Sequence, residues 1–143
     1  MNKLLFPQEV EVWYIIPSIR RELALELVKI GMNQKQAAEA LGVTTAAISQ
    51  YKSEKRGSSK KFNEKINREI HESAIKIKAK KSTVFHEIMK ISRMVKDQGI
   101  LCKIHKEMGN SHENCEKSCR NFYLNQNSCI INEKAAKMSK VKC

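Results

Sequence analysis

The chain contains no long apolar run. No stretch approaches the roughly 18 consecutive apolar residues that a membrane-spanning helix needs. The short apolar run in the first seven residues is also too brief for a secretory signal. These absences argue against a membrane or secreted protein and predict a cytoplasmic location.

Features on which many enzymes depend are missing as well. The sequence has no glycine-rich phosphate loop, no pair of carboxylates in apolar surroundings and no evident nucleophile with a matching base. It carries five cysteines but no Cys-x-x-Cys pair, which a thiol oxidoreductase would be expected to show. We therefore expect neither enzymatic activity nor a small-molecule substrate.

Positive charge is abundant. The 143 residues include 27 Lys and Arg against 15 Asp and Glu, a formal net charge of +12. Such a balance favours a polyanionic partner, although solvated surface lysines give the same total. Five basic residues crowd one ten-residue stretch with only Glu54 opposing them: Lys52, Lys55, Arg56, Lys60 and Lys61.

Apolar spacing predicts helices over most of the first hundred residues. Residues 10–16 have the composition of a strand, which Pro17 ends while starting a helix that continues to Gly31. Two short helices follow over 34–41 and 44–51, and two longer ones over 62–79 and 83–96. From Gly99 onward the periodicity fades, so no helix is predicted there. The expected class is all-α, with a DNA-binding domain over 1–60, a supporting or dimerisation region over 61–98 and a cysteine-rich cofactor segment over 99–143.

The two short helices have the spacing of a helix-turn-helix. Asn33 and Thr44 are suited to cap them, and Gly42 supplies a positive φ at the turn. Ala38 is small where the helices approach, and Ile48 is expected to face inward together with Tyr51. The outer face would then enter the major groove, where glutamine pairs with adenine and a small side chain contacts a thymine methyl. The predicted DNA contacts are Gln34, Thr44, Thr45, Ala46, Ser49, Gln50, Lys52, Lys55 and Arg56.

The run Gln34-Lys-Gln-Ala-Ala-Glu-Ala-Leu-Gly-Val-Thr-Thr-Ala-Ala-Ile-Ser-Gln-Tyr51 resembles the Cro/phage-repressor (XRE-like) helix-turn-helix. Together with Val12-Trp-Tyr-Ile-Ile-Pro-Ser-Ile-Arg-Arg-Glu-Leu23, it is similar to a group of predicted archaeal transcriptional regulators over about residues 9–57. That group commonly carries a cysteine-bearing C-terminal segment. The stretch Gly99-Ile-Leu-Cys-Lys-Ile-His105 resembles the start of that segment. A further cysteine pair of the group is absent here, because Met89 and Ser92 occupy its place.

Four cysteines within 28 residues supply the thiolates that a metal cofactor needs. Cys102, Cys115, Cys119 and Cys129 match the four ligands of a 4Fe-4S cluster or of tetrahedral zinc. Their wide, irregular spacing favours an iron-sulfur cluster held by a loop. The open alternatives are a structural zinc site that uses His105 or His112 with some of the cysteines, a thiol–disulfide switch, and no function. Cys143 is expected to be an unengaged thiol.

These patterns together predict a sequence-specific transcription regulator that senses redox or iron state through the cluster. Its partner would be a double-stranded DNA operator. The protein is expected to bind it as a homodimer, because regulators with one short reading helix usually bind two-fold symmetric operators with two copies of that helix. The alternative is a DNA-binding regulator with structural zinc or a thiol switch and no cluster.

Overall fold

The computed structural model describes residues 4–53, 62–108 and 115, and regular structure within them is helical throughout. The elements are α1 (Pro7–Val10), the π-helical turn η1 (Glu11–Ile15), α2 (Ile16–Lys29), α3 (Gln34–Leu41), α4 (Thr45–Lys52), α5 (Glu64–Lys78), α6 (Val84–Asp97) and α7 (Ile100–Glu107). No strand occurs in the described ranges, which agrees with the predicted all-α class. Within these ranges, no helix has the length and apolar character needed to cross a membrane.

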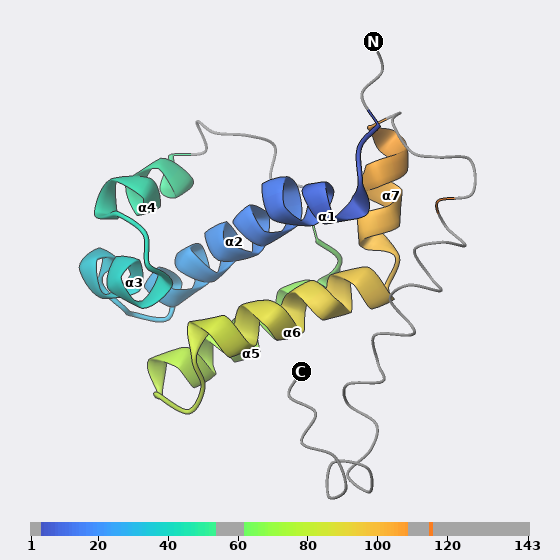
Figure 1. Cartoon of the computed structure of the whole chain (residues 1–143). Coiled ribbons are helices and arrows are strands. Elements are labelled where there is room, and N and C mark those ends of the chain that lie inside the picture. Colours follow the sequence, from blue (N-terminus) through green and yellow to red (C-terminus); the bar gives the residue numbers. More distant parts are fainter. Residues whose placement is uncertain (1–3, 54–61, 109–114, 116–143) are drawn as a thin grey trace, which may run out of the picture.

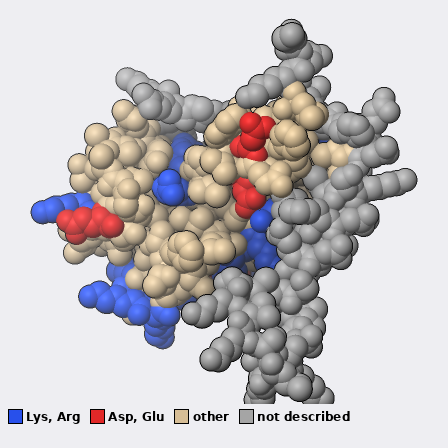
Figure 2. Space-filling model, in the orientation of Figure 1, with Lys and Arg blue, Asp and Glu red and all other residues tan. Residues whose placement is uncertain are grey.

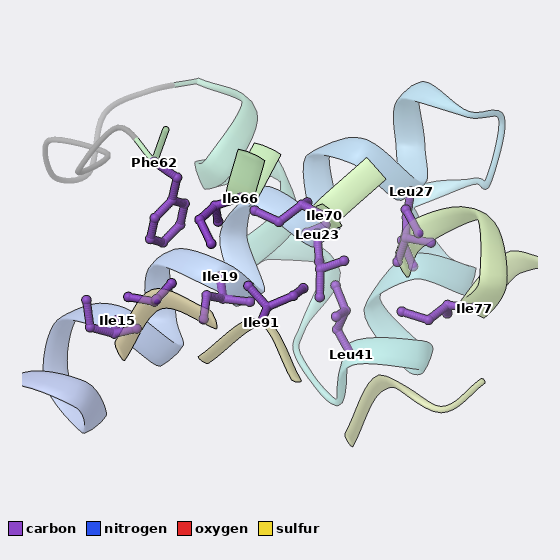
Figure 3. Packing of buried hydrophobic residues seen from close by; sticks show 14 of the residues in the cluster. Ile15, Ile19, Leu23, Leu27, Leu41, Phe62, Ile66, Ile70, Ile77 and Ile91 are labelled. Carbon is purple, nitrogen blue, oxygen red and sulfur yellow. The ribbon is translucent and has the colours of Figure 1, made fainter. Parts of the chain in front are cut away.

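Helix α2 is the axis of the core. Helices α3, α4, α5 and α6 all pack against it (Figure 1). Its buried side includes Ile19, Leu23 and Leu27, which are fully buried. Side chains of α2 and α5 point toward one another around Leu23 and Ile70 (Figure 3). Each fully buried side chain of this size contributes roughly 1.5–3 kcal/mol, so this contact anchors the smaller helices.

The prediction of a strand over residues 10–16, made from their composition, is wrong. The chain is helical without interruption from Pro7 to Lys29. In η1 the helical turn contains one extra residue, because the Ile16 N–H bonds to the Glu11 carbonyl five positions earlier. The widened turn brings Val10 and Ile15, five positions apart, into the core. It also ends two residues before Pro17, which has no N–H to continue the α-helical ladder. The β-branched residues are therefore buried by a helix.

Helices α5 and α6 agree with the sequence prediction, and each begins at a capping side chain. Asn63 accepts a hydrogen bond from the Ile66 N–H at 3.0 Å, and Thr83 accepts one from the His86 N–H at 3.2 Å. Satisfying these otherwise unpaired amide groups fixes where each helix starts.

A buried carboxylate joins α5 to α6. Glu87 is only 2% exposed and accepts a hydrogen bond from the Ser73 hydroxyl at 2.5 Å, while the Lys90 ammonium lies 2.8 Å away. Burial raises the pKa of Glu87, but hydrogen bonds from Lys90, Ser73 and Ser82 and the charge of Lys90 outweigh it and lower the pKa to about 2. The carboxylate is therefore ionised within the folded protein at neutral pH.

Helix α7 was not predicted from the sequence. It packs against α1 and α6, and its Leu101, Ile104 and His105 side chains are buried. Only eight residues long, it is too short to show a clear apolar period and depends on these contacts for its stability. In Figure 1, α7 and α1 lie together at the end of the molecule away from α3 and α4.

Candidate nucleic-acid interface

Local interactions define the geometry of α3, α4 and the turn between them. The Asn33 side chain accepts a hydrogen bond from the Gln36 N–H at 2.8 Å and so caps α3. Gly42 ends α3 with φ 64°, and the Val43 N–H then bonds to the Ala38 carbonyl at 3.0 Å. The left-handed conformation at Gly42 is one that a residue without a Cβ adopts at little cost. The chain therefore turns within three residues and enters α4.

Helix α4 has one buried side and one exposed side. Its N-terminus is capped by Thr44, whose hydroxyl accepts a hydrogen bond from the Ala47 N–H at 3.1 Å. Ile48 is fully buried and Tyr51 is partly buried against the core. The predicted contact residues on the opposite side, together with Thr44, are all exposed: Thr45, Ala46, Ser49, Gln50 and Lys52. The sequence-predicted division into inner and outer faces is thus present.

One side-chain contact joins the exposed parts of α3 and α4. The Ser49 hydroxyl donates a hydrogen bond to the Gln34 side-chain oxygen at 3.4 Å, across 15 positions of sequence. Gln34 is partly buried at the first position of α3. The structure therefore brings these two predicted residues into one continuous polar surface.

Arg21 attaches the far end of α4 to α2. Its Nη2 lies 3.4 Å from the Tyr51 carbonyl, within the last turn of α4, and its Nη1 lies 3.0 Å from the Glu22 carboxylate. A guanidinium beside the C-terminal carbonyls of a helix also complements the helix dipole. Sequence reasoning missed this positioning residue, because nothing local distinguishes Arg21 from its neighbour Arg20.

Charge is distributed unevenly over the surface. On the face drawn in Figure 2, basic side chains gather over the junction of α5 and α6, where Lys78, Lys80 and Lys81 are exposed, and the surface over α4 is mostly uncharged. Lys52 supplies the positive charge among the predicted contacts that the structure describes. The predicted contacts Lys55 and Arg56 lie outside the described residues. The candidate interface on α4 is accordingly polar more than basic.

The predicted cofactor ligands are described only in part. Cys102 on α7 and Cys115 are partly buried thiols, whereas Cys119, Cys129, Cys143 and His112 lie outside the described residues. Among the residues that are described, no three metal-ligating side chains come together. A pair does: the Cys115 sulfur lies 3.3 Å from Nδ1 of His105. Sequence reasoning gave His105 only as an alternative ligand, because its burial depends on the unpredicted helix α7.

Comparison of the chain with protein-family models, curated proteins and solved structures finds no match.

Proposed function

We propose that the protein is a sequence-specific DNA-binding transcription regulator in which α3 and α4 form a helix-turn-helix and α4 reads the major groove. The observation that carries the proposal is that one side of α4 is buried in the core and the other side is exposed. Ile48 holds one side in the core, and Thr45, Ala46, Ser49 and Gln50 are exposed together on the other. Side chains of these types match the hydrogen-bonding and methyl groups of base edges in the major groove.

The surroundings of α4 support this role. A reading helix must be held rigidly, since hydrogen bonds to bases depend on exact placement of the side chains. The Thr44 cap, the buried Ile48 and the Arg21 contact with the Tyr51 carbonyl restrain α4 at its start, middle and end. The start of α3 adds free backbone N–H groups beside Gln34, which suit a phosphate.

The proposed partner is a double-stranded operator with two-fold symmetry, bound by a homodimer. Such symmetry places two reading helices in successive major grooves, about 34–36 Å apart. Non-specific attraction to phosphates would come from the net charge of +12.

The cysteine segment is proposed to hold a cofactor through which the regulator senses its signal. A 4Fe-4S cluster on Cys102, Cys115, Cys119 and Cys129, sensitive to redox or iron state, is one form of this proposal, and zinc is the other. Cys102 and Cys115 have the thiol chemistry and partial exposure that ligands to either cofactor need. Anaerobic purification, with absorption spectra and with iron, sulfide and zinc analyses, distinguishes the two forms.

The DNA-binding proposal is tested by selecting bound sequences from random duplexes and titrating the enriched site. Gln50→Ala is expected to weaken binding to that site by roughly 1–3 kcal/mol, the value of one bidentate base contact, while leaving non-specific binding unchanged. Gln8→Ala is the matched control, because Gln8 is an exposed glutamine on α1, away from α4. Failure to enrich any sequence, or equal affinities of the Gln50→Ala and Gln8→Ala variants, would contradict the proposal.

A further inference from the structure

His105 is a buried histidine with both ring nitrogens engaged. Only 2% of the residue is exposed. Its Nε2 lies 2.6 Å from the carbonyl oxygen of Leu5, one hundred positions earlier in the chain, and its Nδ1 lies 3.3 Å from the sulfur of Cys115. Leu5, far away in the sequence, and Cys115, ten positions after His105, therefore meet at one imidazole.

The Leu5 carbonyl determines which ring nitrogen carries the proton. A carbonyl oxygen can only accept a hydrogen bond, so Nε2 must be the nitrogen that donates. In the neutral ring, Nδ1 then has an available lone pair, and this lone pair faces Cys115. A histidine anchored through one N–H on a carbonyl, with the other nitrogen available, is the arrangement that metal-ligating histidines show.

The distance between the two candidate donor atoms also suits a metal. Tetrahedral zinc has bonds of about 2.3 Å to sulfur and about 2.0–2.1 Å to nitrogen, which places the two ligand atoms about 3.5 Å apart. The observed separation of 3.3 Å between Nδ1 and Sγ is close to this value. Small movements of the two side chains would give both atoms a zinc bond.

From this geometry we infer that His105 and Cys115 are two ligands of a zinc site, with Nδ1 of His105 as the nitrogen donor. The inference rests on the proposed cofactor role of the cysteine segment and chooses between its two forms. An all-cysteine 4Fe-4S cluster has no place for an imidazole, whereas zinc sites commonly combine nitrogen and sulfur ligands.

The inferred site is also connected to the rest of the fold through Leu5 and α1. Leu5 lies two residues before the start of α1, and α1 packs against both α7 and η1, which continues into α2. A zinc ion on His105 would hold α7 and the N-terminal segment together through the Leu5 carbonyl. Zinc is therefore expected to raise the melting temperature of the protein.

X-ray absorption at the zinc edge tests the ligands on the unaltered full-length protein, after titration with Zn²⁺ alone. The expected first shell contains sulfur at about 2.3 Å and at least one imidazole nitrogen at about 2.0–2.1 Å. A shell of sulfur alone, or no zinc binding in a competition titration with a chelator, would overturn the inference. Because no residue is replaced, this result does not depend on the folding of a variant.

Substitution of His105 gives a second, independent readout. His105→Ala is expected to weaken zinc binding by at least about tenfold, since even the loss of a group that only orients a ligand costs about 10–100-fold. His86→Ala is the matched control, because the His86 side chain is exposed on α6. A His105→Ala protein with unchanged helix content and unchanged zinc affinity would exclude His105 as a ligand.

These results are separable from the DNA-binding proposal. Gln50→Ala tests DNA binding without altering His105 or Cys115, and zinc binding is measured without DNA. A protein that selects an operator but shows a sulfur-only shell retains the proposed function and loses the zinc inference. A protein with the mixed shell that selects no operator gives the reverse result.

Discussion

The Ser49 hydroxyl on α4 donates a hydrogen bond to the side-chain oxygen of Gln34 on α3, at 3.4 Å, on the exposed side of the candidate interface. Two side chains proposed to contact DNA are therefore connected before any ligand arrives. Such a contact orders both side chains, which lowers the entropy cost of fixing them on a partner.

We expect the effects of Gln34→Ala and Ser49→Ala on DNA binding to be coupled. Each substitution should reduce affinity for the selected site several-fold, and the double variant should lose less than the two losses combined, by roughly 0.5–1 kcal/mol. The free energy of unfolding should change by no more than about 0.5 kcal/mol, because the bond is exposed. Binding titrations and urea unfolding measure the two quantities.

The control for this cycle is Gln98→Ala. Gln98 also accepts an exposed side-chain hydrogen bond, from Asn63 at 2.6 Å, but lies just after α6. Its replacement should leave DNA affinity unchanged. Strictly additive losses for Gln34 and Ser49 would show that their contact has no role in binding.

The packing of α3 against α4 predicts a sharp contrast between two alanines of one helix. Ala38 is 3% exposed and its carbonyl accepts the hydrogen bond that closes the turn, whereas Ala40 faces solvent. Ala38→Leu should destabilise the protein by about 1–3 kcal/mol through overpacking, and Ala40→Leu by less than about 0.5 kcal/mol. Urea unfolding of both variants provides the comparison, and equal stabilities would disprove close packing at Ala38.

The buried Glu87 carboxylate predicts how stability depends on pH. Its pKa in the folded protein is about 2, below the ordinary value of 4.5, so ionisation stabilises the fold above pH 4.5. That contribution is lost as the pH falls through the folded-state pKa, and its full size is on the order of 3 kcal/mol. Thermal melts between pH 7 and pH 2 should therefore show falling stability below about pH 5.

Replacing this carboxylate with a neutral amide isolates its contribution. Glu87→Gln should lower the free energy of unfolding at pH 7 by roughly 3 kcal/mol, because it removes the stabilisation that the lowered pKa of Glu87 represents, and should flatten the acid dependence. Lys90 keeps its ion pair with Glu69 in this variant. Glu72→Gln changes an exposed carboxylate on the same pair of helices and serves as the control. An acid profile for Glu87→Gln that matches the profile of the unaltered protein would contradict the assignment.

Local chemistry explains which parts of the structure could be predicted from the sequence. The capping of α3 by Asn33, the left-handed Gly42 and the Thr44 cap each depend on residues within four positions of one another. The buried Ile48 and the exposed Gln50 follow from the helical period once those ends are known. The inner and outer faces of α4 were therefore predictable without any tertiary contact.

Prediction from the sequence failed where the conformation depends on contacts with residues distant in the sequence. Residues 10–16 have β-branched side chains that suit a strand, but burial of Val10 and Ile15 in a helical core outweighs that preference. Helix α7 lacks the length to stand alone and forms against α1 and α6. Its position then decides that His105 is buried.

The sequence by itself determined the two capped short helices, the turn between them and the residues exposed on α4, because these depend on spacings of a few residues. Only the tertiary structure decided that His105 meets the Leu5 carbonyl and Cys115, that Glu87 is buried beside Ser73, and that Arg21 holds the end of α4. Each of these pairs joins residues at least ten positions apart. Their meeting depends on the packing of whole helices, which no local pattern specifies.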